Sequence, residues 1–214
     1  MRLTLAILVL GLGVTAQAAT AQDPRLAARL LEPDRARVQA LLDSAQTAGL
    51  PVEPLVDRAL EGASKRATGD RIVAAVRRFR DELALARDAL GTRASTAELT
   101  AGASALRAGA GPDDLRQLRE LRAAQPVTVA AAVLADLVAV GVPADSATAA
   151  VLSIATHVDD AEFLAFRRNV ERDVAMGASP TAALVVRLSG LGAIRTTTGE
   201  GAPSTSPPSG PRKP

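Results

Sequence analysis

Residues 72–90 read IVAAVRRFRDELALARDAL, and the apolar side chains in this stretch return every three or four positions. That period places them on one face of an α-helix, because a helix completes a turn in 3.6 residues. The positions concerned are Ile72, Val76, Phe79, Leu83, Ala86 and Leu90. Arginine, aspartate and glutamate occupy much of the rest of the stretch. The pattern therefore predicts an amphipathic helix that buries one face.

The same spacing recurs on both sides of this helix, in residues 38–45, 115–121, 129–140 and 163–174. No stretch alternates convincingly between apolar and polar positions, and the chain has three phenylalanines and no tryptophan or tyrosine to build a sheet. Ser95 with Glu98, and Asp159 with Glu162, have the spacing of a capping box at a helix start. The sequence therefore predicts an all-α fold.

Four segments combine glycine with a following proline, a pattern typical of the end of one helix and the start of the next. Glycine adopts the left-handed conformation that closes a helix, and proline fits the first turn of the following one. The segments are Gly49–Pro51, Gly109–Pro112, Gly141–Pro143 and Gly177–Pro180. With looser breaks between them, they predict about nine helices in antiparallel hairpins. Two arrangements fit, a short α-solenoid-like stack or an irregular helical bundle.

Residues 1–21 have the features of a secretory signal peptide. Arg2 is followed by an uncharged run from Leu3 to Val14, and residues 16–21 offer small-x-small patterns that a signal peptidase cleaves. A membrane-spanning helix needs about 20 apolar residues, more than this run supplies. We therefore expect a periplasmic or secreted protein with no stable membrane insertion after cleavage. The mature helical domain is predicted over 22–194.

The composition excludes several classes of protein. The chain has no cysteine, which rules out disulfides, thiol chemistry and a bacterial lipid anchor. Its 25 basic and 23 acidic residues nearly balance, so the charge indicates no nucleic-acid partner. Residues 195–214 are rich in threonine, serine, proline and glycine and are predicted to form a disordered tail.

Few side chains suggest chemistry. His157 is the only histidine, and Asp159 and Asp160 beside it make a poor ligand set, so no metal site is predicted. Glu61 is spaced to pair with Lys65, although it could also be the lone acid of a cell-wall hydrolase. We predict no catalytic, cofactor-binding or metal residues and no cofactor.

Several arginines cluster along two of the predicted helices, at Arg77, Arg78 and Arg80 and again at Arg167 and Arg168. Such a cluster could bind an anion. Carboxylates follow at once, however, in Asp81 and Glu82. The arrangement therefore favours a solvated face whose charges are neutralised locally.

These observations lead to two hypotheses for function. The first is an exported, non-enzymatic helical protein that binds a protein or peptide partner in the bacterial cell envelope. It follows from the signal-like segment, the repeated helices and the lack of converging catalytic groups. The alternative is a cell-wall or carbohydrate-active hydrolase that uses a lone carboxylate, with Glu61 as the first residue to test.

Overall fold

The structure is a computed structural model that describes residues 23–199, with side chains as far as residue 191. This part of the chain contains ten helices and no strand, which confirms the predicted all-α fold. The helices are α1 (Pro24–Ala27), α2 (Asp34–Thr47), α3 (Glu53–Ser64), α4 (Gly69–Leu90), α5 (Thr96–Ala108), α6 (Pro112–Leu121), α7 (Thr128–Ala139), α8 (Ala144–Ile154), α9 (Asp160–Ala175) and α10 (Pro180–Gly199). Nine of them match predicted segments. The tenth, α1, is a single turn that Asp23 caps.

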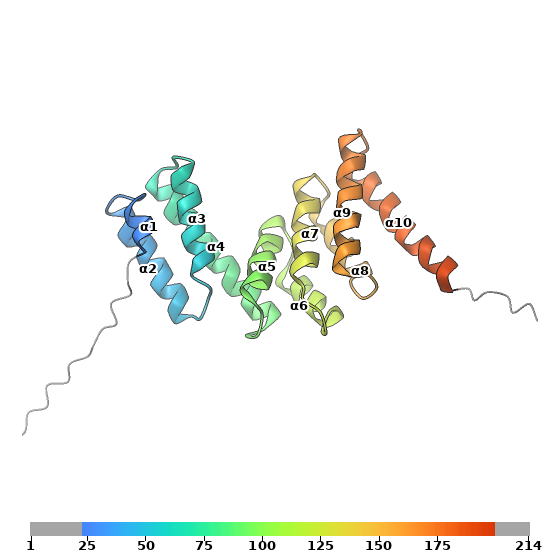
Figure 1. Cartoon of the computed structure of the whole chain (residues 1–214), viewed down its shortest axis with the longest axis horizontal. Helices are drawn as coiled ribbons and strands as arrows, with labels where there is room; N and C mark the ends of the chain where they lie inside the picture. The colour runs from blue at the N-terminus through green and yellow to red at the C-terminus, as the bar shows by residue number, and fades with distance from the viewer. Residues whose placement is uncertain (1–22, 200–214) are drawn as a thin grey trace, which may run out of the picture.

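The helices follow one another in chain order along the long axis of the molecule (Figure 1). The main contacts join helices that are one or two places apart in the chain. A single buried cluster of mostly alanine, valine and leucine side chains runs from α1 to α10. The result is an elongated helical bundle, closer to the predicted stack than to a bundle closed around one centre.

Consecutive helices do not all pack as hairpins. The most extensive contacts join α5 to α7, and α4 also packs on α6. Small side chains on α5 explain this arrangement, because Ala101, Gly102, Ala103 and Ala105 are buried and let neighbouring helices approach. A Cβ added at Gly102 would lie 3.1 Å from Leu90 Cδ1. The helix α5 is therefore held between α4 and α7, and α6 packs on α4 close to Gly102, whose added Cβ would lie 3.4 Å from Leu115 Cδ1.

The glycine–proline segments form the turns that the sequence predicts, with one difference. Gly49, Gly109, Gly141 and Gly177 all have positive φ, which glycine adopts without the penalty that a Cβ brings. Pro112 and Pro180 begin α6 and α10. Pro51 and Pro143 were predicted to lie in the first turn of the next helix, and this prediction is wrong. Both lie just before their helices, because α3 starts at Glu53 and α8 starts at Ala144.

Glu98 is a buried carboxylate that ties the start of α5 to the start of α7. It completes the predicted capping box with Ser95, accepts a hydrogen bond from the Val127 N–H at 3.2 Å and pairs with Arg119. Burial raises the pKa of Glu98, but the hydrogen bonds from Ser95, Val127 and Arg119 together hold it below its ordinary value. Glu98 is therefore a structural group that is ionised at neutral pH.

Arg122 is buried at the end of α6 and connects two turns. Its guanidinium donates to the carbonyls of Pro126 at 3.1 Å and Val158 at 3.1 Å, and to the Asp160 carboxylate at 2.6 Å. It also lies 5.2 Å from the centre of the Phe163 ring, a cation–π distance. These contacts link the α6–α7 turn to the first turn of α9, and so fix the start of α9.

The helical region ends later than predicted. The helix α10 runs to Gly199, so residues 195–199, assigned to the tail from the sequence, belong to it. The predicted signal peptide at 1–21 and the remainder of the tail lie outside the described residues. Among the described helices, none combines the length and the apolar character needed to cross a bilayer.

Candidate binding groove

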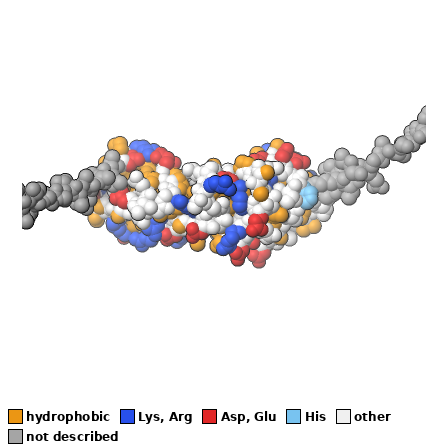
Figure 2. Space-filling model, turned by 90° about the horizontal axis from the view of Figure 1, so that it is seen from below, with side chains coloured by type: hydrophobic (Ala, Val, Ile, Leu, Met, Phe, Trp, Pro, Cys, Tyr) orange, Lys and Arg blue, Asp and Glu red, His pale blue; other side chains and the backbone are white. Residues whose placement is uncertain are grey.

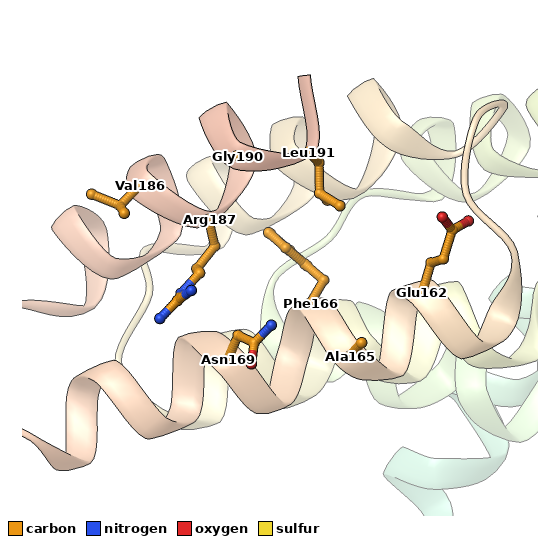
Figure 3. Close-up of a pocket in the computed structure, with 8 residues that line it drawn as sticks. All are labelled: Glu162, Ala165, Phe166, Asn169, Val186, Arg187, Gly190 and Leu191. Carbon is orange, nitrogen blue, oxygen red and sulfur yellow. The ribbon is translucent and has the colours of Figure 1, made fainter. Parts of the chain in front are cut away.

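A groove of about 210 Å³ lies between α9 and α10, at the end of the bundle (Figure 3). Five of its eight lining residues are apolar or glycine. The lining comes from Glu162, Ala165, Phe166 and Asn169 of α9 and from Val186, Arg187, Gly190 and Leu191 of α10. Such a volume accepts an apolar side chain or two, which is smaller than a typical pocket for a drug-sized ligand.

The two walls follow from local sequence. The helix α9 begins with the predicted capping box, in which the Glu162 N–H donates to Asp159 at 2.8 Å, and its apolar stripe buries Phe163 and Phe166. The helix α10 packs Ala183 and Leu184 into the core. The helix α10 is the last helix of the described residues, and its main contacts are with α9 and α8.

The exposed surface of α10 is unusually apolar for a terminal helix. Val185 is 55% exposed and Val186 is 62% exposed. The terminal units of helical stacks normally present polar side chains to water, since no neighbour buries them. An exposed valine in the groove lining, with a second exposed valine next to it, is typical of a surface that a partner covers.

The charged residues in the groove are engaged within the molecule. Glu162 accepts a hydrogen bond from the Asp159 N–H at 2.8 Å. Arg187 donates two hydrogen bonds of 2.6 Å to Asp173, and this contact lowers the pKa of Asp173. A ligand therefore meets apolar walls, the Asn169 amide and the Glu162 carboxylate, which forms no ion pair among the described residues.

The α9 rim of the groove carries two cations. Arg172 lies three positions after Asn169, on the same face of the helix, and its guanidinium donates to the Asn169 side chain at 3.3 Å. Arg168 is exposed beside it. Neither arginine forms an ion pair with another described residue. The rim is therefore positive where the groove itself is neutral.

Glu61, the candidate acid, lies on the exposed side of α3 in an ion-pair cluster. Its carboxylate accepts from Lys65 Nζ at 2.6 Å, as predicted, and from Arg58 at 3.1 Å. The hydrogen bond from Lys65, with the positive charge of Arg58, lowers the pKa of Glu61. A general acid needs the opposite shift, because it must hold a proton near neutral pH. The surroundings of Glu61 thus weigh against the hydrolase alternative.

The other candidates lie apart from the groove lining. His157 is exposed, and its Nδ1 lies 2.8 Å from the Thr156 hydroxyl. Within residues 23–199, no three potential metal ligands come together. Arg80 and Arg167 pair with Asp81 and Asp136, as predicted for a locally neutralised face. The other three arginines of the two clusters, Arg77, Arg78 and Arg168, form no ion pair with a described side chain.

None of the groove residues Val186, Gly190 and Leu191 is predicted as a site residue from the sequence. A signal was nevertheless present in the run Leu184-Val185-Val186, which places apolar side chains on both sides of α10. A helix with apolar residues on more than one face needs more than one neighbour. That reasoning would have marked α10 as a helix with an unpartnered face.

Comparison of the chain with protein-family models, with curated proteins and with solved structures gives no match.

Proposed function

We propose that the protein is a non-enzymatic binding module whose α9–α10 groove takes an apolar segment of a protein or peptide partner. The observation that carries the proposal is the mostly apolar groove, whose lining includes the exposed Val186 next to the exposed Val185. Burying such side chains against a partner is favourable by about 25 cal/mol per Å² of apolar area. The groove is thus suited to anchoring a partner through one or two apolar side chains.

The chemistry of the rim favours one kind of occupant. Most of the lining is apolar, Arg187 is paired with Asp173 and Glu162 is the only lining charge without an ion pair among the described residues, so the anchoring side chains should be uncharged. Arg168 and Arg172, one step outside it, favour carboxylates next to the anchor. We therefore propose an occupant with leucine-, isoleucine- or phenylalanine-like anchors, flanked on the α9 side by aspartate or glutamate.

The site of action that we propose is the bacterial cell envelope or the medium. The support is the signal-like segment at residues 1–21 and the absence of cysteine from the whole chain. A fusion of residues 1–30 to a reporter that is active only after export would test this part. Reporter activity that depends on the apolar run at 3–14 is expected, and its absence would refute export.

The binding proposal can be tested by selecting from a displayed library of random 12-residue peptides on the purified full chain. We expect enriched peptides with an apolar pair and nearby acidic residues. Val186→Asp should abolish their binding, because it places a charge against the apolar wall, while circular dichroism stays unchanged. Failure to enrich any sequence, or peptides that bind Val186→Asp equally well, would refute the proposal.

A further inference from the structure

A second pocket, of about 220 Å³, lies between α3 and α4 and is far more basic than the α9–α10 groove. Its lining carries three cations, Arg58, Lys65 and Arg71, and one carboxylate, Glu61. The floor is formed by Gly62, Ala67, Ile72 and Ala75. Basic side chains also gather on the N-terminal part of the molecule in the face seen in Figure 2.

The glycine in the floor keeps the two helices close. A Cβ added at Gly62 would lie 2.8 Å from Ile72 Cγ1, closer than side-chain packing allows. The close approach brings the Arg58 and Lys65 side chains of the α3 segment to the same pocket as Arg71 of α4. The close packing of α3 and α4 at Gly62 thus brings Arg58, Lys65 and Arg71 to one pocket.

Glu61 neutralises only part of this charge. It pairs with Lys65 and Arg58, whereas Arg71 forms no ion pair among the described residues and is exposed. Lys65 retains donors beyond the one it gives to Glu61, because an ammonium group has three. The pocket therefore has an excess of cations over carboxylates, with free donors on Lys65 and Arg71.

We propose that the α3–α4 pocket binds an oxyanion, the phosphate or carboxylate group of a small ligand, between Lys65 and Arg71. Arginine and lysine are the side chains that proteins use to bind such groups through charge-assisted hydrogen bonds. In this arrangement Glu61 and the ligand compete for the same cations. Removing the charge of Glu61 should therefore strengthen binding, whereas removing a cation should weaken it. The site is independent of the α9–α10 groove and of the function proposed for it.

The test is a titration of the full ¹⁵N-labelled chain with inorganic phosphate and, separately, with succinate at constant ionic strength. Amide shifts confined to residues 61–72 are expected. A response to phosphate alone assigns a phosphate ligand, a response to succinate alone assigns a carboxylate, and a response to both assigns a general oxyanion site. Absence of localised shifts with either anion would overturn the proposal.

Three variants make the test sharper. Arg71→Gln should weaken binding by about fivefold, the effect of losing one exposed ion pair. Glu61→Gln should strengthen binding, because it removes the competing carboxylate. Arg78→Gln, an exposed arginine of α4 outside the pocket lining, should leave the affinity unchanged. Weaker binding by Glu61→Gln, or equal effects of the two arginine variants, would contradict the assignment.

Discussion

The Arg122 guanidinium donates to the Asp160 carboxylate at 2.6 Å, although Arg122 follows α6 and Asp160 opens α9. Arg122 has a side chain only 1% exposed, and its remaining donors meet the carbonyls of Pro126 and Val158. One side chain thus fixes the entry of α9, which forms a wall of the binding groove.

Replacing Arg122 with methionine should destabilise the fold strongly. The variant fills much of the same space but leaves the Val158 and Pro126 carbonyls without their donor. Removing one partner from a buried charged network typically costs about 3 kcal/mol or more. Urea unfolding followed by circular dichroism would measure the change. Arg116→Met is the control, since Arg116 is half exposed and pairs only with Asp113; it should cost less than about 1 kcal/mol.

Acidification should lower the free energy of unfolding, because the Glu98 carboxylate becomes protonated. Its pKa is lowered in the folded protein, so its contribution is present above the ordinary value of 4.5 and is lost as pH falls through the lower folded pKa. Below that range both folded and unfolded carboxyls are protonated. Unfolding free energies measured from pH 7 to pH 3 should therefore decline below about pH 4.5, and the decline should be shallower in Glu98→Gln. An unchanged slope in Glu98→Gln would show that other carboxylates are responsible.

Gly109→Ala tests the turn that separates α5 from α6. Gly109 has φ of 111°, and an added Cβ would lie 3.0 Å from the Ala144 Cβ. Left-handed conformations cost residues with a Cβ about 1–2 kcal/mol, so the variant should lose a similar amount of stability in thermal or urea unfolding. Gly190→Ala is the matched control, because its added Cβ meets no atom within 4 Å. Alanine is a better helix former there, and stability should not fall.

Arg172→Glu tests the proposed preference for acidic flanks. The substitution reverses the charge on the α9 rim without entering the groove lining. Peptides with acidic flanks should bind about tenfold more weakly at low salt, and the difference should shrink at 1 M salt, where screening is strong. Fluorescence anisotropy with a labelled peptide would measure both. Equal affinity of wild type and variant at low salt would show that the rim does not contribute.

The helices were predictable because their determinants are local. Ile72, Val76 and Phe79 mark a buried face by spacing alone, and Gly109 and Gly141 mark turns by their conformational freedom. The capping box of Ser95 and Glu98 was recognisable for the same reason. Local pattern was less reliable at helix starts, as Pro51 and Pro143 show.

The groove and the buried ionic contacts were not predictable, because they depend on which helices meet. The sequence predicts only that Glu98 caps a helix. In the structure Glu98 also accepts hydrogen bonds from Arg119 and Val127, which are more than 20 residues away in the chain. An arginine at a helix end is normally expected at the surface, whereas the Arg122 side chain is buried. The groove arises only when α10 packs against α9 and leaves Val186 exposed in its lining.

The most direct measurement of the central claim is the affinity of a selected peptide for Gly190→Leu. Gly190 lines the groove and has open space at its Cβ position, so leucine would fill the groove while favouring the helix by about 1 kcal/mol. Ser189→Leu adds the same side chain at an exposed neighbouring position outside the lining. We expect Gly190→Leu to remain folded and to lose at least about tenfold in affinity, equivalent to 1.4 kcal/mol, while Ser189→Leu binds like the wild type. A folded Gly190→Leu protein that binds the peptide as tightly as the wild type would contradict the binding proposal.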